Sequence, residues 1–218
     1  MNITREKMNY DLVIVGAGPS GLSAAINFKK LCKKNGKDLS VCVVEKGSEV
    51  GAHILSGAIL EPRALNELIE DWETDEDCPV KVPVKKESLK FLTETNSYEI
   101  PGIFTPSVMH NKGNFIISLG NFCKWLAKKA EDLGVEIYPG FSASELLIDN
   151  DKLNGIITGD LGLDKNGERG PNFQPGIEIH SKYTLFAEGC RGHLGKRLIN
   201  KFKLRQNSQH QTYGIGLK

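Results

Sequence analysis

The sequence predicts an α/β fold with a Rossmann-like parallel sheet and an inserted antiparallel β layer. First, the apolar run Leu12–Val15 leads directly into the glycine motif GAGPSG of residues 16–21, as in nucleotide-binding βαβ units. Second, another apolar segment follows at 40–46, after a stretch with helical spacing. Third, residues 144–160 and 176–187 alternate in the manner of antiparallel strands.

The first element is a strand that ends in a phosphate-binding turn. A continuous apolar run at Leu12–Val15 is typical of a parallel strand covered on both faces by helices. Gly16 permits a tight turn, Gly18 lets the backbone approach a pyrophosphate, and Gly21 lets the next helix pack closely on the sheet. The first turn of that helix, with Ser20, presents free N–H groups and a partial positive charge to phosphates.

The next two elements complete a βαβ order. A helix is expected from Gly21 to about Lys34, with Gly36 as its stop. The strand over 40–46 then places Glu45 where a carboxylate can accept hydrogen bonds from ribose hydroxyls, which favours FAD or NAD over a 2′-phosphorylated cofactor. The pattern therefore predicts a dinucleotide site, and a glycine turn without a ligand is the alternative.

Loops of small residues and polar, proline-interrupted stretches separate the remaining elements. In chain order we expect a loop over 47–60, a helix over 62–72, a surface excursion over 71–77 and 81–87, a helix over 119–133, a short strand within 135–140, antiparallel strands within 144–160 and 176–187, and a helix within 190–202. The strand that ends in TLFAEG is expected to be the last parallel strand.

Composition narrows the class of protein. A net charge of +1 over 218 residues argues against a nucleic-acid partner. No run of 18 apolar residues is present, so no membrane-spanning helix is expected. The five cysteines include no C-x-x-C pair, which excludes a recognisable disulfide framework, metal site or iron–sulfur spacing. Because the first apolar run is the nucleotide-binding strand itself, we expect neither a secretory signal nor a transit peptide.

Three longer stretches carry a family resemblance. They are GAHILSGAILEPRALNEL (51–68), TLFAEGCRGHLGKRL (184–198) and QTYGIGLK (211–218). With the glycine motif, they resemble the two-dinucleotide-binding-domain flavoproteins, and among these the electron-transfer flavoprotein:ubiquinone oxidoreductases. The resemblance runs from Tyr10 to Lys218. It implies the Rossmann-like sheet of that flavoprotein type, and an enzyme that passes electrons from reduced electron-transfer flavoprotein to ubiquinone in the respiratory chain.

The resemblance also implies cofactors, partners and a location. The family uses FAD and a 4Fe-4S cluster, and its cluster cysteines, quinone pocket and second FAD stretch lie in the C-terminal half, beyond the equivalent of Lys218. We therefore expect residues 1–218 to be an incomplete FAD-binding domain, the N-terminal portion of a longer flavoprotein, which alone holds FAD poorly and is inactive. The implied partners are electron-transfer flavoprotein, ubiquinone and a membrane surface on which the enzyme is monotopic. The cytoplasmic face of a bacterial inner membrane is expected, with the mitochondrial inner membrane as the alternative.

The resemblance implies cofactor contacts from five parts of the chain. The glycine motif meets the pyrophosphate, the end of the second strand meets the adenosine ribose, and the small-residue loop passes the ribityl chain and isoalloxazine. Backbone after the third strand touches adenine, and the turn after the last strand returns to the pyrophosphate. In this order the residues are Gly16, Gly18, Ser20 and Gly21, then Glu45 and Lys46, then Gly51, Ala52, Ser56 and Gly57, then Ala143, and finally Ala187, Glu188 and Gly189. No catalytic side chain and no metal ligand are expected in this chain, since the flavin carries the redox step.

Several assignments stay open from the sequence. Related flavoproteins place an arginine where Ser118 stands, and Arg63 is either its substitute or a surface charge. His53 in the flavin-proximal loop has an electrostatic role or none. The apolar segment 100–117 either dips into a bilayer or folds over the core. Another FAD-dependent oxidoreductase of the same fold, such as a geranylgeranyl reductase-like enzyme or a flavin monooxygenase, and a non-catalytic nucleotide-binding module are the alternative functions.

Overall fold

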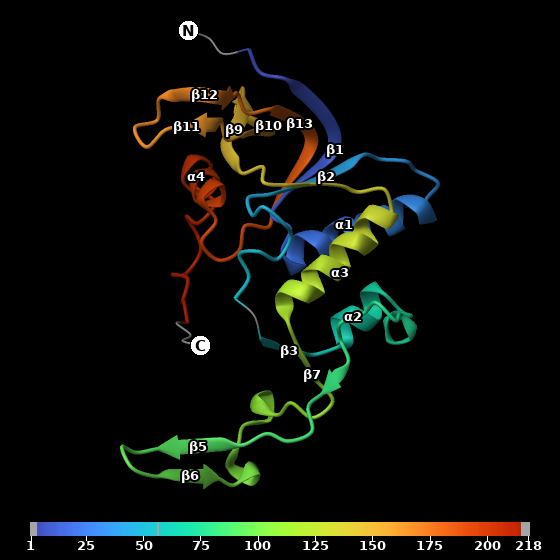
Figure 1. Cartoon of the computed structure of the whole chain (residues 1–218), viewed down its shortest axis with the longest axis vertical. Coiled ribbons are helices and arrows are strands. Elements are labelled where there is room, and N and C mark those ends of the chain that lie inside the picture. The colour runs from blue at the N-terminus through green and yellow to red at the C-terminus, as the bar shows by residue number, and fades with distance from the viewer. Residues whose placement is uncertain (1–3, 56, 215–218) are drawn as a thin grey trace.

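The computed structural model of the chain describes residues 4–55 and 57–214. Its main layer is a six-stranded sheet, drawn in the upper half of Figure 1. Along the sheet the strands are β8 (Glu136–Pro139), β2 (Val41–Glu45), β1 (Lys7–Val15), β13 (Glu178–Phe186), β10 (Lys152–Thr158) and β9 (Ala143–Asp149).

The parallel half of the sheet holds the predicted nucleotide-binding strands. β1 lies between β2 and β13 and is parallel to both, and β2 is parallel to β8. Val13 and Ile14 of β1 and Cys42 and Val43 of β2 are fully buried. The predicted apolar strands are thus confirmed, and β1 begins earlier than expected because Lys7 already pairs with Glu178.

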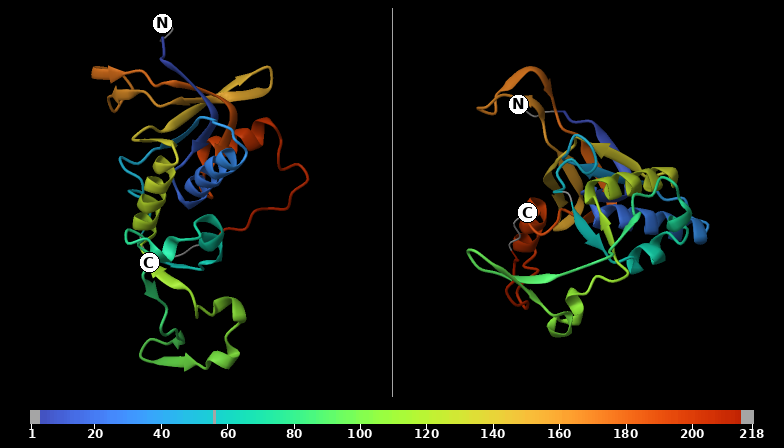
Figure 2. Two further views of the ribbon diagram at one scale, coloured as in Figure 1. Left: turned by 90° about the vertical axis from the view of Figure 1, so that its right-hand side faces the viewer. Right: turned by 60° about the horizontal axis from the view of Figure 1, so that its bottom comes forward.

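Two helices cover one face of this half. α1 (Pro19–Lys34) and α3 (Leu119–Asp132) confirm the helices expected after the glycine motif and over 119–133. Both pack on the face that carries Ile14 and Val43, as Figure 2 shows from two further directions. The parallel strands with helices across them form the Rossmann-like unit that the sequence predicts.

The antiparallel strands extend the same sheet. β9 and β10 form a hairpin, and β10 pairs antiparallel with β13 through Gly155, Ile156 and Ile157. They therefore continue the parallel sheet at the edge of β13, where the sequence had indicated a small inserted layer. Between β10 and β13, outside the ranges expected to be strands, the chain forms a further hairpin, β11 (Leu161–Leu163) with β12 (Arg169–Gln174).

The expected loop and helix between residues 47 and 72 differ from the structure. The loop ends in a strand, β3 (Ala58–Leu60), which joins β7 (Phe115–Ile117) and β4 (Val82–Pro83) in a small sheet. The helix α2 covers only Arg63–Leu68, because Ile69 is extended (φ −138°, ψ 94°). This break lets the chain turn Trp72 into the core, where the side chain is 3% exposed.

The polar segment after α2 is anchored more firmly than a surface excursion. The 3-10 turn η1 (Trp72–Thr74) leads to Cys78 and Val80, which are buried in the core under α3. Sequence reasoning missed these anchors because a few apolar residues stand among many charged ones. The segment is therefore packed against α3, although most of its acidic side chains face solvent.

At the far end from the main sheet lies a separate projection (Figure 1). It consists of the hairpin β5 (Leu89–Leu92) and β6 (Ser97–Ile100), followed by the 3-10 turns η2 (Gly102–Phe104) and η3 (Ser107–Met109). The last helix, α4 (His193–Lys201), packs through the fully buried Leu194 on the sheet face opposite α1. That helix confirms the one expected within 190–202.

Candidate functional site

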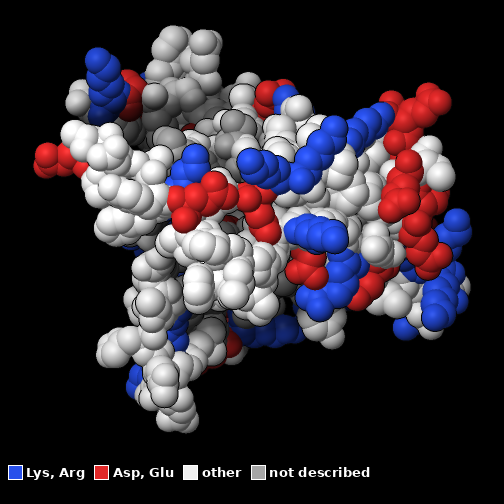
Figure 3. Space-filling view, turned by 90° about the horizontal axis from the view of Figure 1, so that it is seen from below, with Lys and Arg blue, Asp and Glu red and all other residues white. Residues whose placement is uncertain are grey.

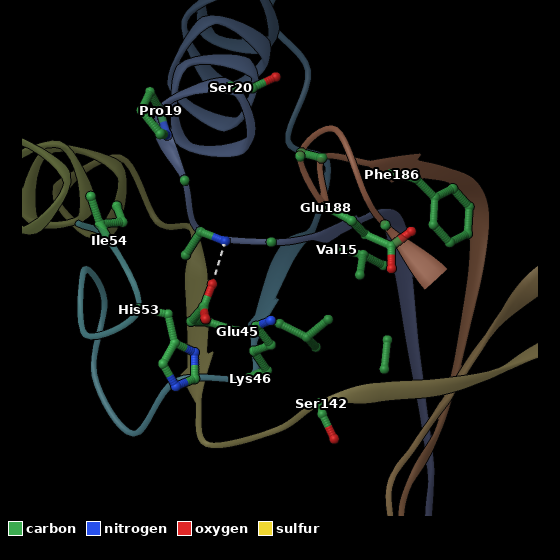
Figure 4. A pocket seen from close by; sticks show the side chains of 18 of the residues that line it. Val15, Pro19, Ser20, Glu45, Lys46, His53, Ile54, Ser142, Phe186 and Glu188 are labelled. Carbon is green, nitrogen blue, oxygen red and sulfur yellow. Dashed lines mark hydrogen bonds between the residues drawn. The ribbon is translucent and has the colours of Figure 1, made fainter. Parts of the chain in front are cut away.

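A pocket of about 660 Å³ opens at the carboxyl ends of β1, β2 and β13. Figure 4 shows it lined by the turn after β1, the end of β2 and the turn after β13. Open α/β sheets bind ligands outside the carboxyl ends of their strands, and the volume lies in the range of roughly 300–1,000 Å³ of ligand sites. Three predicted groups of residues therefore meet in one cavity.

The glycine motif adopts the geometry that a pyrophosphate site requires. A Cβ built on Gly16, whose φ is 107°, would lie 2.5 Å from the carbonyl oxygen of Ala187. A Cβ on Gly21 would lie 2.0 Å from the carbonyl oxygen of Gly16. A Cβ on Gly18 would meet no atom within 4 Å, so that its backbone stays open to a ligand. These positions match the three roles expected of the motif.

The N-terminus of α1 has the character of an anion site. Gly18 is its N-cap, Pro19 stands in the first turn, and no side chain caps the free N–H groups. That turn contains no acidic residue, and Pro19 and Ser20 line the pocket. Uncapped amides and the helix dipole together favour a phosphate.

Glu45 lies at the end of β2, inside the pocket. Its Oε2 accepts a hydrogen bond from the Ala17 N–H at 3.0 Å, the dashed line in Figure 4. Its Oε1 accepts from the Gly47 N–H at 2.7 Å. Each carboxylate oxygen keeps a further lone pair, so these bonds fix the carboxylate without preventing contact with a ribose. Lys46 lines the same pocket.

The small-residue loop contributes one of its expected residues, Gly51, and two others. Gly51 lines the pocket and approaches α3 closely, since a Cβ there would lie 2.8 Å from the carbonyl oxygen of Gly120. Ala52 and Gly57 are not among the residues that line the pocket, and His53 and Ile54 are. Ser56 lies outside the described residues. The flavin contacts expected of this loop therefore remain predictions.

The other two predicted groups lie at the opposite wall. Ala143 is buried and lines the pocket beside Ser142. Ala187 donates its N–H to the carbonyl oxygen of Val15 at 2.8 Å, which holds the last turn against the first. Gly189, at φ 76°, lines the same wall.

Glu188 also borders the pocket, and its carboxylate has partners in α4. The Leu194 and Gly195 N–H groups donate to it at 3.2 and 2.7 Å. Its side chain is only 10% exposed. The residue is thus brought to the predicted place, with its carboxylate already hydrogen-bonded to protein.

The structure offers a further candidate for the cationic side chain that contacts the pyrophosphate. Ser118 caps α3, accepting from the Asn121 N–H at 3.4 Å. Arg63 does not line the pocket, and its Nε lies 3.5 Å from Oε1 of Glu61. This position favours the interpretation of Arg63 as a surface charge over its role as a substitute for the missing arginine. Arg191 does line the pocket. Sequence reasoning missed it, although its place just after Gly189 was a usable signal.

Four of the five cysteines lie in the protein interior. These are Cys32, Cys42, Cys78 and Cys123. Burial raises the pKa of the Cys42 thiol to about 12 and that of Cys123 to about 11, which keeps both protonated and unreactive. Among residues 4–55 and 57–214, no group of three or more His, Cys, Asp or Glu side chains could hold a metal ion.

The chain is similar to a family of nucleotide-binding domains and to several curated proteins. A family model described as an NAD(P)-binding Rossmann-like domain matches residues 14–71. A probable electron transfer flavoprotein-ubiquinone oxidoreductase of Acinetobacter baylyi is 59% identical over 100% of this chain, which covers 39% of that protein. The Pseudomonas aeruginosa protein of that name is 57% identical over 98% of the chain and is 39% covered. The mitochondrial protein of Bos taurus is 49% identical over 100% of the chain and is 35% covered.

Solved structures share the fold at lower identity. A geranylgeranyl bacteriochlorophyll reductase-like protein from Thermoplasma acidophilum has a TM-score of 0.59 at 21% identity, with 84% of this chain and 40% of that chain covered. A flavin-dependent brominase has a TM-score of 0.56 at 21% identity, with 89% and 41% covered. These likenesses show an α/β fold shared with flavoproteins. The chain spans about two fifths of the length of the curated relatives that it matches.

Proposed function

We propose that this chain, which is homologous over its whole length to the N-terminal part of the electron transfer flavoprotein-ubiquinone oxidoreductases, forms the FAD-binding portion of such an enzyme. The observation that carries the proposal is the identity of 59% and 57% to two bacterial relatives across 100% and 98% of the chain. Fold similarity alone would leave many flavoenzymes open. Identity above one half over essentially the whole chain favours this family.

The residues of the pocket fit FAD. The uncapped N-terminus of α1 and the open approach to Gly18 suit the pyrophosphate. Glu45 suits the adenosine ribose, because its fixed carboxylate accepts hydrogen bonds and would repel a 2′-phosphate. When bound, FAD supplies the redox chemistry. The chain binds and orients it, and the Gly16 turn and the wall at Ala187 hold the two sides of the cavity together.

The proposed reaction moves electrons from reduced electron-transfer flavoprotein to ubiquinone. Oxidoreductase activity, both partners and a 4Fe-4S cluster all follow from the relatives' family and are proposals for this protein. The cysteines of this chain have no cluster spacing, so we place the cluster in the part of the relatives that the chain does not span. Bacterial and mitochondrial relatives make the corresponding inner membrane the proposed location.

The projection at the far end of the molecule supports contact with a membrane surface. Its side chains include Ile103, Phe104 and Val108, which are 84%, 71% and 91% exposed. Phe91 and Leu92 of the hairpin add to them. Seen from this end, uncharged side chains predominate over the left of the surface, whereas most charged ones gather on the right (Figure 3). A concentration of exposed apolar side chains is typical of a membrane or protein contact.

The structure also divides the apolar segment 100–117. Residues 103–109 face solvent, whereas Phe115 packs edge-on against Trp72 and Ile117 is buried. Only the first part is therefore available to a bilayer, together with the hairpin. Within the described ranges no helix has the length and apolar character that crossing a bilayer requires. We accordingly propose monotopic attachment through the projection.

Expression of the complete gene tests the proposed function. The purified protein should show flavin absorbance, an electron paramagnetic resonance signal of a reduced 4Fe-4S cluster, and reduction of ubiquinone by reduced electron-transfer flavoprotein. Glu45→Gln should lower the flavin content, and Glu61→Gln, an exposed carboxyl outside the pocket, should not. Flavin without a cluster would indicate another FAD-dependent oxidoreductase. Neither signal would indicate a nucleotide-binding module without redox chemistry.

A further inference from the structure

Two helices begin at the pocket, and their N-termini differ. The first turn of α1 has neither a capping side chain nor an acidic residue. The first turn of α4 is occupied by the carboxylate of Glu188, which comes from the end of the preceding strand. The amides of α1 are therefore free for a phosphate, whereas those of α4 already have an anionic partner.

Glu188 takes the place of an N-cap side chain. Leu194 and Gly195, the second and third residues of α4, donate their N–H groups to Oε1 and Oε2 at 3.2 and 2.7 Å. These are the amides that an Asp or Ser at the N-cap position would satisfy. The actual N-cap is Gly192, which has no side chain. The carboxylate thus reaches the helix from outside it.

The absence of a side chain at Gly192 follows from this arrangement. A Cβ there would lie 2.5 Å from the Cβ of Glu188 and 2.7 Å from its Oε2. The backbone of Gly192, at φ −54° and ψ 131°, is open to any residue. Space, and not backbone conformation, therefore excludes a larger residue. Glu188 and Gly192 form a matched pair.

The pair fixes one wall of the pocket. Glu188 follows Ala187, whose N–H is bonded to the end of β1, and α4 is held to the sheet by the buried Leu194. The carboxylate closes the intervening turn by joining its first part to its last. Gly189 and Arg191, which line the pocket, lie within that turn.

We propose that Glu188 is a positioning residue that holds the turn 187–193 against the dinucleotide, in place of the direct FAD contact expected from the sequence. The pyrophosphate then uses the N-terminus of α1. Arg191 lies within the same turn and lines the pocket, with its guanidinium 5.7 Å from the centroid of the Tyr213 ring. This inference rests on the proposed function only in taking FAD as the ligand. His193 Nδ1, 3.3 Å from Oε1, adds a partner when protonated.

Moving the cap from one position to the other tests the proposal. In the protein expressed from its complete gene, Glu188→Gly should expose the α4 amides to hydrogen exchange and raise the Kd for FAD at least about tenfold. Adding Gly192→Asp supplies a carboxylate at the N-cap, in space that Glu188→Gly has vacated. The double variant should regain both amide protection and FAD affinity, to within about threefold of the original.

Three results would contradict the positioning role of Glu188. If Glu188 contacts FAD directly, the double variant recovers protection of α4 while its Kd stays as high as that of Glu188→Gly. An unchanged Kd in Glu188→Gly would also overturn the proposal. Glu188→Gln gives a second measurement, because its side chain has one accepting oxygen in place of two. One of the two α4 amides then loses its partner, although the side chain can still bond a ligand hydroxyl. A Kd equal to that of the unaltered protein would then refute positioning. An unaltered protein that binds no FAD would instead refute the proposed function.

Discussion

Single residues of the glycine motif serve separable purposes. Gly21 is required by the protein itself, since a Cβ there would lie 2.0 Å from a backbone oxygen and 3.2 Å from Cγ2 of Ile14. Gly18 meets nothing within 4 Å, so the folded chain has room for a side chain at that position. Its requirement for glycine arises only when a ligand occupies the pocket.

Alanine substitutions should separate folding from binding. Gly21→Ala forces the start of α1 away from the sheet, and overpacking of this kind costs about 1–3 kcal/mol. Its Tm should fall by roughly 2–10 °C. Gly18→Ala should leave the Tm of the ligand-free protein within about 2 °C and raise the Kd for FAD about tenfold. Thermal unfolding and flavin titration measure the two effects. A loss of stability in Gly18→Ala would contradict this division.

At the scale of elements, the ion pair between Asp75 and Lys129 is one of two that tie the segment after α2 to α3. Asp75 accepts a hydrogen bond from the Trp125 Nε1–H at 3.0 Å, and Lys129 Nζ lies 2.6 Å from Oδ2. Lys129, followed by the Trp125 hydrogen bond, lowers the pKa of Asp75 to about 2 from its ordinary 3.8. Together with the buried Cys78 and Val80, this contact explains why a segment rich in acidic residues stays packed.

The lowered pKa predicts a pH dependence of stability. A carboxyl whose pKa is lower in the folded state stabilises the fold above its unfolded pKa, and this contribution is lost as the pH falls. For Asp75 the loss should run from about pH 4 to about pH 2. Asp75→Asn should lower the free energy of unfolding at pH 6. In this variant the free energy of unfolding should also decrease less between about pH 4 and about pH 2. Urea unfolding at several pH values measures both, with Asp149→Asn, an exposed carboxyl at the end of β9, as the control. Parallel pH curves for Asp75→Asn and the original would disprove the coupling.

In the whole molecule, the proposed cofactor site and the proposed membrane contact lie in different places. The nucleotide pocket lies at the carboxyl ends of the main strands, and the apolar projection lies at the end of the molecule that is far from the main sheet (Figure 1). The small sheet of β3, β7 and β4 joins the projection to the core. The proposed transfer of electrons to a quinone in a bilayer would need both a cofactor site and a surface that meets lipid.

Membrane partitioning should depend on the tip of the projection. Phe104→Ser with Val108→Ser removes two exposed apolar side chains and should lower binding of the complete protein to phospholipid vesicles at least about tenfold. Leu31→Ser, at a 48% exposed position on α1, is the matched control and should change it little. Sedimentation with vesicles measures the bound fraction, and flavin absorbance checks the pocket. Unchanged partitioning of the double variant would exclude the projection as the contact.

The local signals in the sequence were sufficient for much of the fold. The apolar runs at β1 and β2 and the periodicity of α3 are signals carried by neighbouring residues, and the strands and the helix that they predict are confirmed. The same holds for placing Glu45 and Ala187 at one cavity, because parallel strands end at the same edge of a sheet. The prediction of a helix over 62–72 was wrong in its length, because burial of the Trp72 side chain outweighed the helix propensity of the residues before it.

Other features were decided only by the tertiary structure. The antiparallel strands join the main sheet through contacts with β13 that are distant in sequence. The carboxylate of Glu188 meets α4 only because the turn after β13 reverses the chain, and Arg191 lines the pocket for the same reason. Spacing along the chain determines which groups reach the end of a strand. Where each side chain then points depends on which amides, cations and cavities the fold brings beside it.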